Sequence, residues 1–311
     1  CGALRCEISR ARPGGCGSRV RRLLLLVAFF LVACEAGPPL PAVTVLATGE
    51  DGGPLADLLD EFTDDTGIPV AIQWGNSSAN ADRVIENSGA PADVLITDNV
   101  ADIWRAADRG ALRPIQSTAI TAVHAAVKDP DSYWTALSTH LHIVVHGNDV
   151  RPLTATYDDL GTAEFAGRIC LSSSSLPANR ALIAYLIDER GVREAERLVR
   201  RWVRNLAQPP FSSKDEVLDA VRSGTCDYGV GVMSNDLEGL TSFTPAPHYF
   251  DVSAAGIGRH ARQPESAQKL LDWLLRNSVV QFKTLHEPAP VWIAGSRDED
   301  ARLLAERAGY R

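Results

Sequence analysis

Hydrophobic and polar side chains alternate with a period of two along residues 139–146. The two sides of this alternation are Leu141, Ile143 and Val145 on one, and His140, His142, Val144 and His146 on the other. The period predicts a β-strand with one buried face and one more polar face. Strand and helix signals alternate before and after it. We therefore expect this strand to cross between two lobes, with its polar face toward the gap between them.

The segment before this strand alternates short apolar runs with helical periodicity. Strands are expected over 42–47, 68–74 and 93–96, and helices over 54–66, 80–87 and 98–109. Pro54 suits the first turn of its helix, and Gly67 suits a left-handed residue that ends it. Strands and helices in alternation predict a parallel sheet with helices on both faces.

The same alternation resumes after the crossing strand. Here strands are expected over 168–171, 226–232 and 249–257, and helices over 157–160, 178–188, 192–205, 212–224 and 266–275. The strand over 249–257 is expected to return the chain to the first lobe. Lobe 1 is therefore predicted to comprise 42–139 and 247–311, and lobe 2 to comprise 140–246.

A charged and then apolar N-terminal segment indicates export. Three arginines precede the apolar run 23–33, which is too short to span a bilayer as a mature helix. The sequence Leu-Val-Ala-Cys at 31–34 resembles a bacterial lipoprotein signal. That resemblance implies cleavage before Cys34 and lipidation of its thiol; a plain secretory signal cut slightly later is the alternative. We expect 1–33 to be removed, with 20–33 as the signal proper, and 34–41 to be a tether. The protein is then periplasmic or at the cell surface, held at the membrane by lipid alone.

The charge balance limits the class of partner. The whole chain carries a formal net charge of −8 at pH 7. Residues 1–33 hold six arginines and one glutamate, so the remainder has 25 basic and 38 acidic groups, a net charge of −13. Nucleic acids require a basic face, so we expect no nucleic-acid partner.

Two cysteines remain once the N-terminal ones are set aside. Cys1, Cys6 and Cys16 lie in the removed segment, and Cys34 is the lipidation site. In an exported protein, a remaining pair indicates a disulfide more than a metal site. We expect Cys170 and Cys226 to form a disulfide in lobe 2.

Several segments resemble, in order, the ferric-iron-binding proteins of bacterial ABC transporters. They are 91–95 (PADVL), 110–114 (GALRP), 129–134 (DPDSYW), 167–174 (GRICLSSS) and 254–257 (AAGI). The resemblance spans nearly all of 42–295. It implies the α/β fold of class II periplasmic binding proteins: two lobes, each with a mostly parallel sheet, joined by two crossover strands, with the ligand in the cleft. It also implies an ABC permease as partner, and we expect a monomer.

The resemblance implies Fe(III) as the transported ligand, but the residues that hold it in the family are altered. The family places two adjacent tyrosines after the strand that corresponds to 226–232, whereas 231–238 here reads GVMSNDLE. Phenolates suit a hard trivalent cation, so their loss leaves a metal to other donors. The candidate metal ligands are Glu50, Asp98, His146 and Asp236. Three of them have a plainer interpretation: Asp98 as a helix cap, Glu50 as a solvated loop residue and His146 as a surface or hinge residue. No resident cofactor is expected.

Hydroxyl and amide groups precede the helix expected at 178–188. A helix N-terminus favours negative charge, so this segment is a candidate anion site, and in the family it holds the anion that accompanies iron. The candidate ligand-binding residues are Ser172, Ser173, Ser174, Ser175, Asn179 and Asn235. An ordinary capping loop is the alternative. His140 and His142, about 7 Å apart at the backbone, form a further candidate pair for a metal.

These features predict a lipid-anchored receptor that delivers a small ligand, Fe(III) or another metal complex, to an ABC permease. A receptor for an anion such as a phosphonate and a ligand-sensing partner of a membrane receptor are the alternatives. An exported hydrolase would pair a hydroxyl of 172–175 with a histidine. The sequence has neither a Gly-x-Ser-x-Gly nor a His-Glu-x-x-His motif, so an enzyme is not expected. Lobe closure would bend the chain near 138–141 and 245–250.

Overall fold

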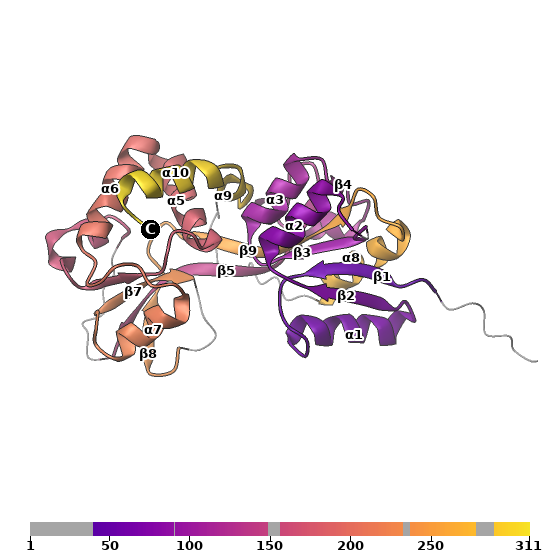
Figure 1. The fold of residues 1–311 in the computed structure, drawn as a ribbon, viewed down its shortest axis with the longest axis horizontal. Helices are drawn as coiled ribbons and strands as arrows, with labels where there is room; N and C mark the ends of the chain where they lie inside the picture. The colour runs from indigo at the N-terminus through magenta and orange to yellow at the C-terminus, as the bar shows by residue number, and fades with distance from the viewer. Residues whose placement is uncertain (1–39, 90, 149–155, 233–236, 278–288) are drawn as a thin grey trace, which may run out of the picture. The chain divides into compact units, whose positions relative to one another are not determined.

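The strands of this protein join into one mixed sheet with helices on both faces (Figure 1). The computed structural model describes residues 40–89, 91–148, 156–232, 237–277 and 289–311. Within them the strand order is β2-β1-β3-β9-β5-β7-β6, with β4 beside β9 and β8 beside β5. No helix in this part of the chain is both long and apolar enough to cross a membrane.

Strands and helices alternate through most of the chain, as the sequence predicts. The strands are β1 (Val43–Ala47), β2 (Val70–Trp74), β3 (Val94–Thr97), β4 (Leu112–Arg113), β5 (Trp134–Gly147), β6 (Ile169–Leu171), β7 (Tyr228–Val232), β8 (Leu240–Phe243) and β9 (Phe250–Gly258). The helices are α1 (Pro54–Thr66), α2 (Ser77–Glu86), α3 (Val100–Asp108), α4 (Ala119–Ala122), α5 (Pro177–Arg190), α6 (Val192–Arg204), α7 (Lys214–Arg222), α8 (Pro264–Asn277), α9 (Trp292–Ser296) and α10 (Asp298–Ala308). Pro54 begins α1, and Gly67 ends it with φ 69°, a left-handed conformation that glycine adopts at little cost.

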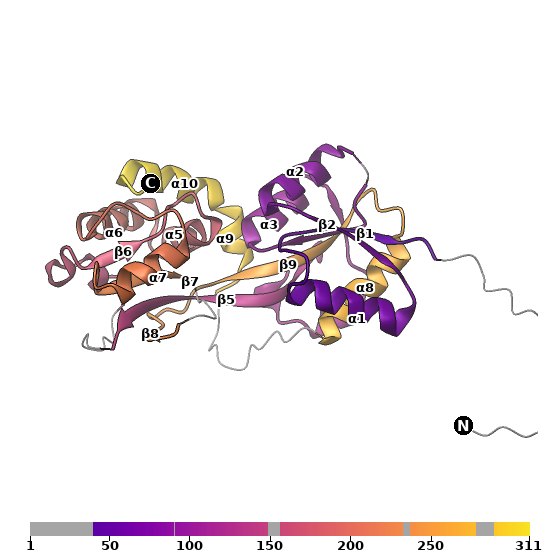
Figure 2. The same ribbon diagram turned by 60° about the horizontal axis from the view of Figure 1, so that its bottom comes forward.

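One end of the sheet consists of parallel strands between two helix layers. β1 lies between β2 and β3 and is parallel to both. The pleat divides their side chains between two cores. Leu46 and Leu95 pack in the core that contains α2 and α3, whereas Val45 and Val94 pack in the core that contains α1 and α8. Figure 2 shows α2 and α3 on one face of these strands, with α1 and α8 on the other.

β5 and β9 are the two strands that cross between the ends of the sheet. β9 pairs antiparallel with β3 and β4, and it also pairs with β5. β5 stays paired with β9 as far as Leu141 and pairs with β7 from His142 onward. Every pairing of β5 and β9 is antiparallel, and the remaining pairings, among β1–β3 and between β6 and β7, are parallel. The predicted α/β fold with two crossing strands is confirmed.

The other end of the sheet is also covered on both faces (Figure 1). Val144 and Val230 pack in the core that contains α5 and α6, whereas Ile143 and Val145 pack under α7. Both faces are therefore dry along this part of β5.

This double cover corrects the prediction of a polar face on the alternating strand. His142 and His146 were expected to look into the gap between lobes, but they are 0% and 3% exposed. His140, which lies in the part of β5 still paired with β9, is half-buried. The period-two pattern found the strand but could not show that helices close over both of its faces.

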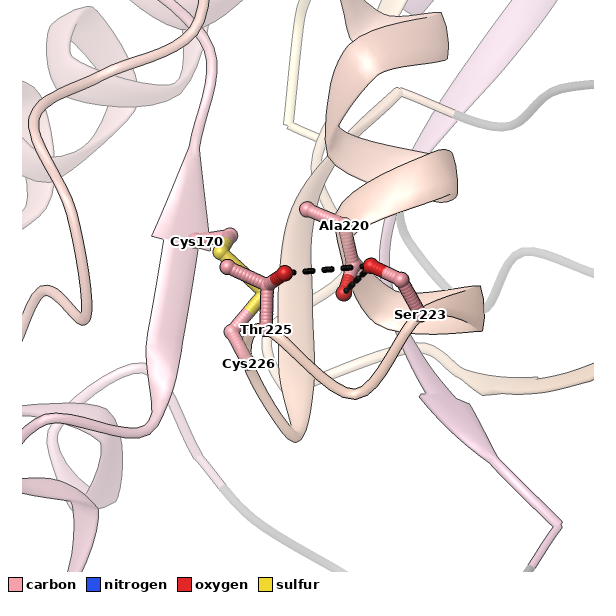
Figure 3. Close-up of a disulfide and its surroundings, with 5 residues drawn as sticks. All are labelled: Cys170, Ala220, Ser223, Thr225 and Cys226. Carbon is pink, nitrogen blue, oxygen red and sulfur yellow. Dashed lines mark hydrogen bonds between the residues drawn. A yellow bond between two sulfur atoms is a disulfide. The ribbon is translucent and has the colours of Figure 1, made fainter.

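Cys170 and Cys226 form the predicted disulfide (Figure 3). Their Cα atoms are 6.0 Å apart, which is the usual separation for such a bond. Cys170 lies on β6, and Cys226 lies between α7 and β7. Beside it, the hydroxyl of Ser223 donates to the carbonyl of Ala220 and also bonds the hydroxyl of Thr225. The disulfide therefore ties the turn after α7 to the neighbouring strand.

The C-terminal helix α10 packs on α5 and α6. Arg180 of α5 pairs with Asp298 at 2.6 Å, and Arg307 of α10 pairs with Glu196 of α6 at 2.9 Å. The hydroxyl of Tyr310 donates to the carbonyl of Ser172 at 2.6 Å. The end of the segment 247–311, which the sequence assigns to lobe 1, is thus joined to elements of 140–246. The exact partition into lobes stays a prediction.

Candidate functional site

A cavity of about 440 Å³ lies where β5 and β9 meet the first turns of three helices. Its walls come from the end of β3, the crossing strands, the loop after β6, and the starts of α3, α5 and α7. The lining residues are Asp98, Asn99, His140, Ser172, Leu176, Pro177, Ala178, Asn179, Ser213, Lys214, Asp215, Asp251 and Ser253. None of them is a tyrosine. Since both predicted lobes contribute, this cavity is the candidate ligand site.

Asp251 is the most deeply buried charged group of the cavity wall. It lies on β9 opposite His140 of β5, and only 2% of it is exposed. Its Oδ1 accepts the backbone N–H of Val100 at 2.9 Å and of Val252 at 2.8 Å. Burial raises the pKa of Asp251 to about 7, although the two N–H groups partly oppose this rise.

Asp98 follows β3 and is exposed at the cavity wall. The plainer reading of Asp98 as the cap of the next helix does not hold, because Asn99 is the cap. The Oδ1 atom of Asn99 accepts the N–H of Asp102 at 2.9 Å, and its Nδ2 atom donates to Asp98 at 2.8 Å. Asp98 does not cap the helix, so its carboxylate is available to a ligand in the cavity.

His140 is held in the wall by two hydroxyl groups. Its Nε2 atom lies 2.9 Å from Oγ of Ser253 and 3.3 Å from Oγ of Ser138. Burial lowers the pKa of His140; Asp98 opposes this shift and Lys214 adds to it. The imidazole is therefore neutral at neutral pH, with Nε2 engaged by serines.

The loop after β6 is ordered by Asn179. Its Nδ2 atom donates to the carbonyl of Ser172 at 3.0 Å, to the hydroxyl of Ser172 at 2.9 Å and to the carbonyl of Ser173 at 2.8 Å. The amide is thus used within the loop, which it holds at the start of α5. The first turn of α5 then lies in the cavity wall, where the positive end of the helix dipole favours a negative charge.

The start of α7 adds a second group of donors and a cation. Ser213 caps this helix by accepting the N–H of Glu216 at 3.2 Å. Lys214 and Asp215 follow in the first turn and line the cavity. Together with α3 and α5, three helix starts meet at one cavity. The arrangement is chemically able to hold a ligand that carries both a cation and an anion.

Three of the predicted ligand residues, Asp98, Ser172 and Asn179, line this cavity. The other three serines do not. Ser173 and Ser175 share a hydrogen bond of 3.0 Å between their hydroxyls, and the hydroxyl of Ser174 donates to the carbonyl of Tyr310 at 2.8 Å. These hydroxyls hold the loop rather than face the cavity.

The other predicted donors do not gather at this cavity. Glu50 is exposed in the loop after β1. His146 is buried, with Nδ1 2.8 Å from the carbonyl of Gly147 and its ring beside those of Tyr228 and Phe243. Asn235 and Asp236 lie outside the described residues.

The proposed metal pair of His140 and His142 does not point into one site. His142 is fully buried, and neither of its ring nitrogens has a hydrogen-bond partner within the described chain. In the same part of the chain, no three His, Cys, Asp or Glu side chains are placed to hold a metal ion together.

Sequence reasoning missed most of the cavity wall. The missed polar residues are Asn99, Ser213, Lys214, Asp215, Asp251 and Ser253, and the apolar ones are Leu176, Pro177 and Ala178. Asp251 carried a usable signal, because it is the one charged residue in the apolar strand 249–257. Aspartate is rarely buried without a partner, so a charge in such a strand marks a candidate functional group.

Residues 43–282 match the family described as bacterial extracellular solute-binding protein. The match covers more than half of the chain, so this protein belongs to that family. Membership confirms the resemblance to the solute-binding proteins of ABC transporters.

Individual relatives agree with this family. Iron uptake protein A1 of Synechocystis sp. (strain ATCC 27184 / PCC 6803 / Kazusa) is 28% identical over 248 residues, 73% of this chain and 69% of that protein. The Fe(3+)-binding periplasmic protein of Serratia marcescens is 22% identical over 237 residues, 70% of this chain and 68% of that protein.

Solved structures are similar over nearly the whole described chain. The Trichodesmium protein IdiA (FutA), in complex with iron and citrate ligands, has a TM-score of 0.78 and 26% identity, covering 87% of this chain and 100% of that chain. The ferric binding protein from Campylobacter jejuni has a TM-score of 0.76 and 20% identity, covering 86% and 100%. The second likeness shows the two-lobed fold alone.

Proposed function

We propose that this protein is the ligand-binding receptor of an ABC importer and that its cavity holds Fe(III) as a complex with a small anion. One observation supports this most directly. The cavity presents the carboxylates of Asp98, Asp215 and Asp251 together with the first turns of three helices. Carboxylate oxygens are hard donors that suit ferric iron, and helix N-termini suit an anion. A cation bound to an anion satisfies both kinds of group.

The ligands of two relatives support the same choice. The Synechocystis relative is an iron uptake protein, and the Trichodesmium structure contains iron and citrate. Iron would be transported cargo here and not a resident cofactor.

The shape of the site favours a complex over a bare ion. Its volume of about 440 Å³ lies in the range of sites for small organic ligands. Within the described chain no three side chains are placed to chelate a metal alone. An anion that brings its own oxygen donors would complete the coordination that the protein leaves open.

Attachment to the membrane forms part of the proposal. Lipidation of Cys34, with 34–41 as the tether, would hold the receptor beside its permease. The support is the lipoprotein-like signal ahead of Cys34, a region outside the described residues. Mass spectrometry of the mature N-terminus tests this point. We expect an acylated Cys34, and release of a Cys34→Ser variant into the soluble fraction would agree. An unmodified N-terminus at another residue would contradict it.

A metal-free anion is the second candidate ligand. Lys214 and the three helix starts favour it, because these groups would attract a phosphonate or a carboxylate without iron. A sensing role would use the same binding event and differ only in the membrane partner.

Calorimetric titration of the mature protein separates these ligands. We expect one ferric citrate complex to bind per protein and citrate alone to bind far more weakly. Equal binding of citrate with and without iron would favour the anion receptor. Absence of heat with ferric citrate, confirmed by elemental analysis after gel filtration, would overturn the proposal.

A further inference from the structure

Asp251 is a buried acidic group with no positively charged partner among the charges that act on it most strongly. The residue is 2% exposed and lines the cavity. Its Oδ1 atom accepts two backbone N–H groups, which are neutral dipoles. The charges that act on it most strongly, those of Asp98 and Asp298, are both negative. The positive partner that a buried carboxylate requires is therefore not supplied by these neighbours.

A purely structural role does not require an acidic group here. Asp251 accepts the N–H of Val100, the first residue of α3, and so steadies that helix from a neighbouring strand. An asparagine side-chain oxygen would accept the same N–H groups, without an acidic group that burial, by raising its pKa, holds partly protonated near neutral pH. The partial positive charge at the start of α3 offsets part of the cost, but the two nearby carboxylates add to it. The retained carboxylate indicates a partner that enters from the cavity.

We propose that Asp251 determines the ligand specificity of the cavity by binding the positively charged centre of the ligand, a multivalent metal cation or its complex. Since Oδ1 is occupied by two N–H groups, Oδ2 is the atom that meets the ligand. The location of the site rests on the proposed function. The added claim is that positive charge on the ligand is required, so a neutral or purely anionic molecule is not held.

The neighbours of Asp251 are compatible with a cation at this end of the cavity. His140, directly opposite on β5, is uncharged and fixed by Ser253 and Ser138. Asp98 adds a second carboxylate to the same wall. Lys214, the cation of the lining, belongs to the first turn of α7, where it would meet an accompanying anion.

Asp129 provides a matched control. It is also a buried aspartate, 8% exposed, and one of its oxygens likewise accepts two backbone N–H groups, from Asp131 at 2.9 Å and Tyr133 at 3.1 Å. It does not line the cavity. The variants Asp251→Asn and Asp129→Asn therefore remove the same charge in similar bonding, once inside and once outside the site.

The test is calorimetric titration of the wild type and both variants with Fe(III) citrate, Ga(III) citrate and La(III) citrate. We expect Asp251→Asn to weaken binding by at least about tenfold, because a contact between charged groups is lost. Asp129→Asn should bind as the wild type does, and circular dichroism should show all three proteins folded.

Each outcome decides the proposal. Equal affinity of Asp251→Asn and wild type for iron would overturn the role of Asp251 and leave the iron receptor standing. If the wild type binds Ga(III) or La(III) but not iron, and Asp251→Asn loses that binding, the cation-binding role of Asp251 is supported and Fe(III) is excluded as the ligand. A wild type that binds none of the three cations would overturn both.

Discussion

The ring of Tyr249 lies stacked on the ring of Tyr185, with centroids 4.8 Å apart and planes 2° from parallel. Tyr157 stacks on Tyr249 as well, at 5.3 Å. The hydroxyl of Tyr249 donates to Glu189, and that of Tyr185 donates to the carbonyl of Phe250. Burial, and then the bond to Glu189, raise the pKa of Tyr249. Tyr249 is buried and is thus committed to the core.

Bound iron should therefore lack the colour of tyrosinate coordination. That colour arises from charge transfer from phenolate to iron, and no tyrosine lines the cavity. We expect titration with ferric citrate, followed by visible absorption, to show no phenolate band. Tyr249→Phe should give the same spectrum. A strong band that disappears in Tyr249→Phe would contradict the buried placement of this residue.

Asn179→Ala should weaken ligand binding as well as stability. The buried amide donates three hydrogen bonds that fix the loop after β6. We expect a loss of about 2 kcal/mol in unfolding free energy and a lower affinity for ferric citrate. Asn205→Ala is the control, because Nδ2 of Asn205 bonds the carbonyls of Leu160 and Thr162 away from the cavity. Asn205→Ala should lower the unfolding free energy without changing the affinity for ferric citrate. An equal loss of affinity in both variants would show that lower stability, and not the loop after β6, weakens binding.

His142 should make the protein sensitive to acid. Burial lowers the pKa of His142 to about 3, whereas the unfolded chain takes up this proton near the ordinary value of 6.5. Between these values the unfolded state binds more protons, so stability rises with pH and is lost as the pH falls from 6.5 toward 3.

We expect His142→Leu to remove this slope and to gain about 2 kcal/mol at pH 5 relative to its effect at pH 7.5. Urea unfolding at the two pH values measures the difference. His260→Gln, which changes an exposed histidine, is the control. Parallel pH profiles for wild type and His142→Leu would show that another group causes the acid loss.

Removal of the disulfide should destabilise the protein strongly. Cys170 and Cys226 are 56 residues apart, and the chain-entropy model gives on the order of 4 kcal/mol for such a loop. Urea unfolding of Cys170→Ser/Cys226→Ser against the oxidised wild type measures this. Reductant should destabilise the wild type and leave the double variant unchanged. A loss below about 1 kcal/mol would mean that residual contacts in the unfolded chain, among the residues that pack under α7 in the native protein, already restrain it.

Ligand binding should close the two lobes. β5 exchanges β9 for β7 between Leu141 and His142, and this change of partner lies at the hinge predicted for 138–141. We expect solution scattering to show a smaller radius of gyration with ferric citrate than without it. Asp251→Asn under the same conditions is the control. An unchanged radius in wild type that calorimetry shows to be saturated would exclude closure.

The sequence predicted the framework better than the site. Seven of the nine described strands, the cap at Gly67 and the disulfide follow from local periodicity, glycine conformation and export chemistry, all of which act within a short stretch or a single pair. The short strands β4 and β8 were not predicted. Burial of His142 and His146 depends on which helices cover β5, and period-two alternation carries no such information. His146 was wrongly expected to be a cleft ligand for the same reason.

The cavity wall depends on distant segments meeting at one point. Asp98, Ser172 and Asn179 were found because each stands at the end of a strand or the start of a helix. Asp251 was missed because its place beside the start of α3 depends on Val100, 151 residues away. A charge inside an apolar strand was the available signal.

Tyr310 anchors the loop at Ser172 and Ser174 across 138 and 136 residues of sequence. Both bonds depend on a single residue near the end of the described chain. Without Tyr310 the protein would keep every described strand of the sheet and the hydrogen bonds of Asn179, but the loop after β6 would lose its contacts with the segment that follows α10. The carboxyl-terminal residues therefore act as a brace for one wall of the cavity.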